Sequence, residues 1–304
     1  MRPEVTRAYT PAGLAAAVAG MFGWGIGIVL IKLTTSHFLV VAVYRHAISL
    51  PLLVLAWLIA SDRSLPWRAA AVGGAIFALH QIAHLGALRY TTAAVVTILF
   101  ALQPIVVGAA GRWVTGERTS KRFYAWSIVA VAGCATLVAG SAAEPGGSAL
   151  GATLAVVNLL LFSAYYLATK KARERVSSTS WLLVMTATSG VILASLAALT
   201  GTSLTVESGR ELGLLAALAI GPATMGHLFI TWAHPRIHAA ASSAVILGVP
   251  VIGTIGTAIF VGESIGPLQV VGGLVALVAA AGAMRNLPPR ATAEAADTFG
   301  EVAT

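Results

Sequence analysis

The sequence predicts an all-α polytopic membrane protein with ten transmembrane helices, arranged as two inverted five-helix repeats. The first observation is composition: 58% of the 304 residues are hydrophobic and only 10% are charged, whereas a soluble globular protein has about 25% charged residues. The second is that apolar runs of about 20 residues, the length of a bilayer-spanning helix, recur along the whole chain. The third is that a pattern of proline, glycine and glutamate in the first half recurs in the second.

Ten apolar runs are long enough to be membrane helices. Helices are expected because backbone polar groups in lipid must be paired within their own segment, and these runs are twice as long as a barrel strand. The predicted spans are 12–33, 37–60, 69–88, 91–111, 124–141, 149–169, 179–199, 211–232, 238–261 and 266–284. They divide the chain into a cytoplasmic N-terminal segment 1–11, a first repeat 12–141, a second repeat 149–285 and a disordered cytoplasmic tail 286–304.

The start of the chain resembles a signal peptide, because Arg2 and Arg7 precede the first apolar run. The run from Ala12 to Leu33 is longer than a typical signal-peptide core, and nine further spans follow it. We therefore expect an uncleaved first membrane helix.

The loop charges orient the spans. Fifteen of the 19 basic residues fall on the side of the N-terminus, while Lys32, Arg89 and Arg210 fall on the opposite side and Arg45 lies within a span. Lys and Arg are enriched in cytoplasmic loops, so both termini are predicted to be cytoplasmic, and the protein to be multi-pass in the cytoplasmic (inner) membrane. Loops that face anionic lipid also explain the net charge of +8 without a nucleic-acid partner.

A repeat is visible at one constant offset along the chain. Pro104 is followed by Gly116 and Glu117, and Pro250 is followed at the same spacing by Gly262 and Glu263. We call the displacement that carries Pro104 onto Pro250 the repeat offset. Because each half has five spans, an odd number, the second half must enter the membrane from the opposite side. Inverted repeats with a site near the midplane are a transporter architecture.

The layout resembles the drug/metabolite transporter superfamily, in particular ten-helix EamA-type transporters. The matching residues are Trp24, Gly25, Lys32, Tyr44, Arg45, Ala87–Thr91, Pro104, Gly116, Glu117, Pro250, Gly262 and Glu263. The resemblance implies two five-helix bundles around a central cavity, with the fifth and tenth spans at the periphery, and often metabolite export.

Polar residues within the spans are mostly histidines. His80, Gln81 and His84 share one face of the third span, and His227 shares a face of the eighth span with two threonines. Gln81 maps onto His227 at the repeat offset, so the two faces are expected to meet between the repeats and to bind substrate, with a histidine that changes charge near pH 6–7. Hydrogen bonding that only holds the bundle together is the alternative.

None of the 11 acidic residues lies in the middle of a span. Membrane carboxylates are the usual proton relays and cation partners, so a multidrug or cation exporter is the less favoured alternative. His80 and His84 nearly form a zinc motif, but glutamine replaces its glutamate and the membrane holds no third acidic ligand. With one cysteine, Cys134, and no phosphate-binding loop or nucleophile elbow, we predict no metal, no cofactor, no catalytic residues and no enzymatic activity.

Four more residues are candidates for a substrate site. Arg45, about nine residues into its span, would clamp a carboxylate or phosphate, or would snorkel to the surface instead. Trp24 lies mid-span, away from the interfacial belt, and is expected to face protein or cavity. Asn158 and Tyr165 lie on one helical stripe, which forms either a cavity wall or packing.

The prolines and the charged helix ends complete the set. Pro104 and Pro250 each remove a backbone hydrogen bond and can bend a helix, so both are hypothesised to be gating hinges. Glu117 and Glu263 are expected to pair with nearby basic residues, and Lys32 to lie at the interface.

These observations predict a secondary active transporter that moves a small polar metabolite outward by alternating access, with amino-acid-like compounds among the candidates. The expected partners are that substrate, the lipid bilayer and a coupling proton or other ion, for a monomer or homodimer. A non-transporting membrane scaffold is the remaining alternative, and it would tolerate loss of the histidine faces.

Overall fold

The computed structural model describes residues 8–60, 64–91, 93–139 and 148–288. Most of the predicted N-terminal segment and tail, together with Arg2, Arg7 and Arg63, lie outside the described residues. The helices are α1 (Pro11–Leu33), α2 (Phe38–Ile59), α3 (Trp67–Tyr90), α4 (Ala93–Phe100), α5 (Gln103–Val114), α6 (Lys121–Ala139), α7 (Ala149–Ala172), α8 (Ser178–Leu199), α9 (Gly209–Leu218), the π-helix η1 (Ala219–Gly226), α10 (His227–Ala233), the 3₁₀ turn η2 (His234–Arg236), α11 (Ala239–Ile246), α12 (Val249–Phe260) and α13 (Pro267–Arg285).

The described residues contain ten helical spans that are long and apolar enough to cross a membrane. This confirms the all-α fold with ten membrane helices. Three spans are not single helices: the fourth consists of α4 and α5, the eighth of α9, η1, α10 and η2, and the ninth of α11 and α12.

Side-chain caps fix where several helices begin. The hydroxyls of Thr10, Ser148, Ser177 and Ser208 each accept a hydrogen bond from a backbone N–H in the first turn of α1, α7, α8 and α9. Such a cap satisfies one of the N–H groups that a helix start leaves without an intrahelical partner.

The repeat found in the sequence is also a structural repeat. The helices α4, α5 and α6 begin and end at positions that the repeat offset carries onto the first and last residues of α11, α12 and α13. Gly116 and Gly262, an equivalent pair, both have positive φ, at 72° and 83°, so each ends its half-helix in a conformation that favours glycine. Because the halves have five spans each, they cross the membrane in opposite directions.

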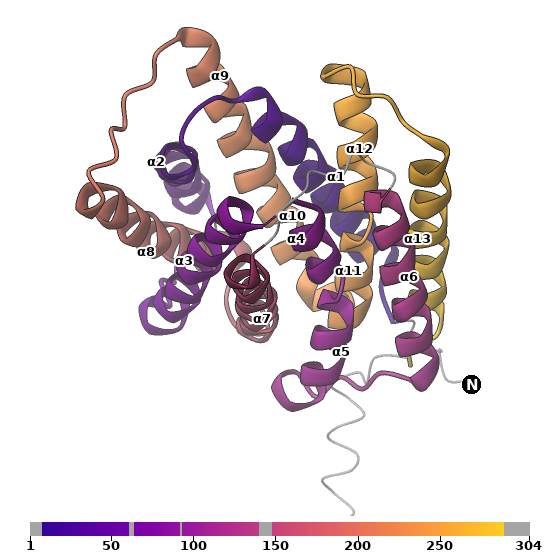
Figure 1. Cartoon of the computed structure of the whole chain (residues 1–304). Coiled ribbons are helices and arrows are strands. Elements are labelled where there is room, and N and C mark those ends of the chain that lie inside the picture. The colour runs from indigo at the N-terminus through magenta and orange to yellow at the C-terminus, as the bar shows by residue number, and fades with distance from the viewer. Residues whose placement is uncertain (1–7, 61–63, 92, 140–147, 289–304) are drawn as a thin grey trace, which may run out of the picture.

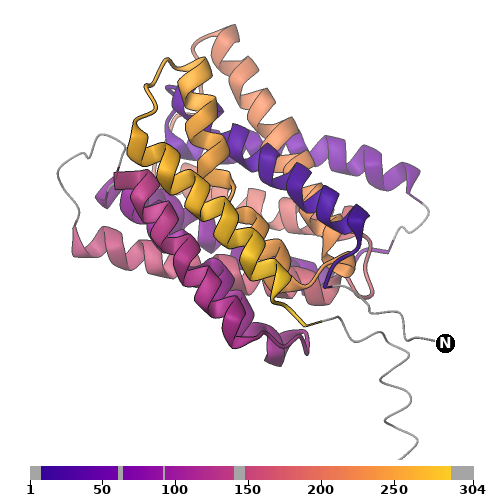
Figure 2. The ribbon, with the colours of Figure 1, turned by 90° about the vertical axis from the view of Figure 1, so that its right-hand side faces the viewer.

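The fifth and tenth spans, α6 and α13, lie side by side at the edge of the bundle (Figures 1 and 2). Glycines allow their close approach: a Cβ added at Gly133 would collide with the backbone of Ala276, and one added at Gly272 would collide with the backbone of Leu137. Small residues serve this purpose in membrane helix pairs. The remaining spans are therefore left to form the centre.

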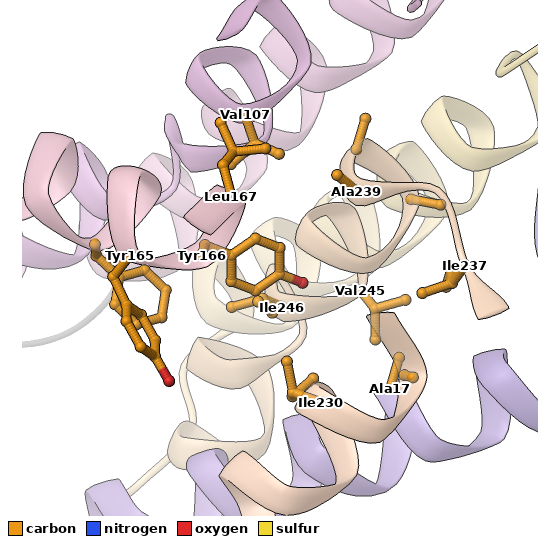
Figure 3. Packing of buried hydrophobic residues seen from close by; sticks show 14 of the residues in the cluster. Ala17, Val107, Tyr165, Tyr166, Leu167, Ile230, Ile237, Ala239, Val245 and Ile246 are labelled. Carbon is orange, nitrogen blue, oxygen red and sulfur yellow. The ribbon is translucent and has the colours of Figure 1, made fainter. Parts of the chain in front are cut away.

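The centre is built from both repeats. α1 packs against α10, η1 and α12, while α3 packs against α7 and α8. Figure 3 shows part of the buried core, in which Tyr166 of α7 lies near Ile246 of α11, with Ile230 of α10 and Ala17 of α1 close by. The outward faces carry exposed apolar side chains such as Leu199 at 86% and Ile259 at 69% exposure, as expected for contact with lipid.

The order of the helices defines two faces of the bundle. α1 begins where α5 and α7 end, and we call this the Glu117 face; α1 ends where α12 ends, and we call this the Glu263 face. The basic residues near the Glu117 face are Arg68, Arg112, Arg118, Lys121, Arg122, Lys170, Lys171, Arg173, Arg175, Arg236 and Arg285. That the Glu117 face is cytoplasmic stays a prediction from this bias.

Candidate functional site

The candidate site lies between the repeats, where rings from α1, α3, α7 and α10 meet. The Trp24 ring lies 4.9 Å from the His227 ring and 5.9 Å from the Phe162 ring, measured between centroids. Phe77 of α3 lies 5.3 Å from His227 and 4.8 Å from Tyr165. One aromatic cluster therefore joins predicted residues from both halves.

The histidines of α3 extend this cluster. The His80 ring lies 4.8 Å from the Phe162 ring and 6.0 Å from the His84 ring, and it is stacked on the latter. The side chain of Asn158, fully buried on α7, lies against His80. Gln81 is also buried, at 5% exposure, one residue further along α3.

Arg45 lies at the other side of His227. Together with His46, Ser49, Phe77 and His227 it lines a cavity of about 10 Å³, shared with Met185, Thr186 and Ala223. That volume admits about one water molecule. The site is thus closed in this conformer, and a substrate would need the helices to separate.

The π-helix η1 positions His227 and the wall opposite Arg45. Pro222 lies inside η1, where its missing N–H weakens regular α-helical pairing. Ser49 of α2 donates to the Ala219 carbonyl at 3.1 Å and accepts from the Thr224 hydroxyl at 2.8 Å, which ties the two repeats together here. Local π geometry of this kind is frequent at functional sites.

Several polar groups around the cluster are buried without a hydrogen bond among the described residues. They are the indole nitrogen of Trp24, Nε of Arg45, Nδ1 of His84 and both side-chain amide atoms of Gln103. Most buried polar groups in native structures are paired, because an unpaired one costs about 1–3 kcal/mol. The groups of Trp24, Arg45 and His84 lie beside His227 or His80, and a polar ligand or ordered water could satisfy them there.

The described residues place no carboxylate beside Arg45. They also contain no group of three His, Cys, Asp or Glu side chains placed to hold a metal ion. The charge of the centre therefore comes from the Arg45 guanidinium, with imidazole rings around it. Such a site favours an anionic group over a cation.

Both predicted hinge prolines lie directly after a break in their span. Pro104 is the second residue of α5, and α4 ends at Phe100; Pro250 is the second residue of α12, and α11 ends at Ile246. Gln103, with its unpaired amide, lies at the break in the first repeat.

The sequence pattern missed part of this cluster. His46, Phe100, Gln103 and Pro222 were not among the candidates, although His46 follows Arg45 and Gln103 precedes Pro104 in the sequence. Phe100 contacts Phe162 at 5.0 Å between ring centroids. Adjacency to a candidate was the only signal that was available for two of these residues.

Comparisons with known proteins agree with this architecture. A solved structure described as "Crystal structure of protein" is similar over 89% of this chain and 96% of its own, with a TM-score of 0.80 and 18% sequence identity. That identity supports the fold alone. A search of curated proteins finds no significant match. The EamA-like transporter family matches residues 11–139 and again residues 149–285. This multi-pass membrane protein therefore belongs to the EamA-like transporter family.

Proposed function

We propose that the protein is a secondary active transporter that moves a small metabolite with an anionic group, an amino acid or related carboxylate, by alternating access. The observation that carries the proposal is the set of buried polar groups between the two repeats that lack a hydrogen bond among the described residues. In this proposal Arg45 binds the anionic group, and Trp24, Phe77 and Tyr165 contact the rest of the molecule. The polar lining is completed by His80, Gln81, His84, Asn158 and His227.

The charge of the site supports an anion rather than a cation. A guanidinium that has no carboxylate partner among the described residues can form strong, bidentate hydrogen bonds with a carboxylate or phosphate. A lipophilic cation would meet like charge there, with no counter-ion from the described part of the chain. The multidrug or cation exporter is thus the weaker alternative.

The remaining features of the proposal follow from topology. If the basic Glu117 face is cytoplasmic, the protein lies in the cytoplasmic membrane with both termini inside. In this proposal the substrate is exported, and its movement is coupled to a proton or another ion. The protein works as a monomer or a homodimer. The two repeats, 12–141 and 149–285, would act as the two moving halves.

The function is tested by untargeted mass spectrometry of culture medium. Cells that express the wild type are compared with cells that express His84→Ala/His227→Ala at matched membrane levels, with His37→Ala, an exposed histidine, as the control. We expect at least one metabolite to accumulate outside with the wild type and His37→Ala but not with the double variant. If all three media are the same, a panel of carboxylates is tested for uptake into proteoliposomes, and no transport there would favour a membrane scaffold.

The prolines are proposed to act as hinges between α4 and α5 and between α11 and α12. Pro104→Ala restores a backbone N–H and allows the two half-helices to join, which should slow the conformational change rather than substrate binding. We expect transport turnover to fall several-fold with little change in apparent affinity. Pro51→Ala, at an exposed position inside the unbroken α2, is the matched control. Unchanged turnover in Pro104→Ala would refute the hinge.

A further inference from the structure

Two lysine–glutamate pairs join the repeats, one at each face of the bundle. At the Glu117 face, Nζ of Lys170 lies 3.0 Å from the carboxylate of Glu117. At the Glu263 face, Lys32 pairs with Glu263. In each pair the lysine belongs to one repeat and the glutamate to the other, so both pairs hold the halves together.

The glutamates of the two pairs are related by the repeat offset, and the lysines are related by their place in the first span of each repeat. Glu117 and Glu263 are equivalent positions, and each lies next to the glycine with positive φ that follows its half-helix. Lys32 lies in the last turn of α1, the first span of its repeat, and Lys170 lies in the last turn of α7, the first span of the other repeat. The same contact has therefore been built twice, in opposite orientations, as inverted repeats require.

The two pairs nevertheless differ in their surroundings. The Lys170 and Glu117 side chains are only 6% and 13% exposed, whereas Lys32 and Glu263 are 47% and 45% exposed. In this structure the pair at the Glu117 face is buried, and the corresponding pair at the Glu263 face is close to solvent. The hydrogen bond from Lys32 still holds the pKa of the Glu263 carboxyl below its usual value.

Glu117 makes further contacts with the second repeat. Its carboxylate accepts a hydrogen bond from the N–H of Ala239, the first residue of α11, at 2.7 Å, and it lies 3.6 Å from the His238 ring. Lys170 also donates to the carbonyls of His234 and Ile237, at 2.7 and 2.5 Å. This carboxylate thereby holds the start of α11, one of the two half-helices of the ninth span, to the opposite repeat.

The buried pair lines a cavity at the Glu117 face. A cavity of about 490 Å³ at the Glu117 face ends on Glu117 and Lys170, with His234 and His238 among its other lining residues. Tyr166, which Figure 3 shows in the buried core, donates a 2.7 Å hydrogen bond to the Ser242 hydroxyl. Its ring lies 6.0 Å from the ring of Phe162 in the aromatic cluster. The pair therefore lies at the wall of the cavity that is open at the Glu117 face.

We propose that Glu117–Lys170 and Glu263–Lys32 are reciprocal locks, each of which closes its own face of the transporter, and that they exchange burial as the protein alternates. In the conformer described here the Glu117 face is locked. In the alternate conformer Glu263 takes the place of Glu117, pairs tightly with Lys32 and caps α4 at Ala93, the equivalent of Ala239 in the first repeat. The inference rests on the proposed alternating-access function.

The test measures thiol accessibility on each face and needs no substrate. In a Cys134→Ser background, one probe is Ser243→Cys on α11, a fully buried position about one helical turn deeper than Ala239. The reciprocal probe is Thr97→Cys on α4, the position that the repeat offset carries onto Ser243. Each is labelled with a membrane-impermeant thiol reagent applied to one side of oriented vesicles.

We expect Glu117→Gln to raise labelling of Ser243→Cys from the Glu117 face about tenfold, as the loss of one charge-assisted bond allows. The same substitution should lower labelling of Thr97→Cys from the other face, because opening one face closes the other. Glu263→Gln should do the reverse. Glu174→Gln, which removes the exposed Lys171 pair within one repeat at the Glu117 face, is the matched control and should change neither rate.

A merely structural ion pair would give a different result. If Glu117→Gln raises both rates together, the variant has loosened the bundle, and the lock is refuted; unchanged rates refute it as well. If the two labelling rates change in opposite directions but the protein moves no carboxylate into proteoliposomes, the locks are supported and the proposed transport function is refuted. If the protein transports a carboxylate but Glu117→Gln leaves both labelling rates unchanged, the transport function is supported and the locks are refuted.

Discussion

Replacing Arg45 by glutamine is expected to abolish most transport while leaving the fold as stable as before. A hydrogen bond to a charged group contributes about 1.5–3 kcal/mol, so losing the guanidinium should weaken binding of an anionic substrate by about tenfold to a hundredfold or more. Stability should not fall, because no carboxylate among the described residues pairs with Arg45 and its Nε is buried without a hydrogen bond. Removing an unpaired buried charge relieves a desolvation cost.

The measurement combines transport into proteoliposomes of the metabolite found by mass spectrometry with thermal unfolding in detergent. Arg45→Lys keeps the charge but loses the planar, bidentate geometry, so its transport should be intermediate. Arg112→Gln, at an exposed position near the end of α5, is the control and should transport normally. If Arg45→Gln instead lowers the unfolding temperature with transport intact, the arginine is structural, as the snorkelling alternative requires.

Replacing Lys170 by methionine is expected to be the most destabilising change at the ends of the spans. Lys170 and Glu117 are both largely buried, and breaking a buried pair by removing one partner costs about 3–5 kcal/mol, since the other charge stays behind in a poorly solvated place. The carbonyls of His234 and Ile237 would lose their donor in addition.

The pseudo-symmetric partner supplies the control for this prediction. Lys32→Met removes the same contact where both side chains are nearly half exposed, and an exposed pair contributes only about 0–1 kcal/mol. The double variant Lys170→Met/Glu117→Gln should recover part of the lost stability, because the uncompensated carboxylate is gone while the amide that replaces it can still accept from the Ala239 N–H. The measurement is the thermal unfolding temperature of the three variants. If Lys170→Met and Lys32→Met lower it equally, the prediction that the buried pair contributes more stability is wrong.

The fold was largely predictable from the sequence, because only helices and closed barrels can satisfy the backbone polar groups of a chain that spans a bilayer. Apolar length predicted each of the ten spans, and the offset between Pro104 and Pro250 predicted a repeat in which α4, α5 and α6 coincide with α11, α12 and α13 when displaced. Proline and glycine act locally, on their own backbone, so their positions in the sequence are enough. The breaks before Pro104 and Pro250 lie where that local chemistry requires them.

The site could be predicted only in part. Helical periodicity showed that His80 and His84 share a face, but it could not show that this face meets Phe162 of α7, or that Trp24 would contact His227 in the other repeat. Gln103 gave no signal of its own, because a polar residue beside a proline looks the same whether it faces lipid, protein or a cavity. Its burial depends on the neighbouring helices.

The sequence by itself determined the membrane class, the ten spans, the repeat and the candidate helix faces, because each of these depends on the length, periodicity or spacing of nearby residues. Only the tertiary structure decided which faces meet, which charged pairs cross between the repeats, and that Lys170 is buried while Lys32 is exposed. Pairs in corresponding places of the two halves can have different environments, because burial depends on which neighbouring helices pack over each pair, and the spacing of residues along the chain does not specify that packing.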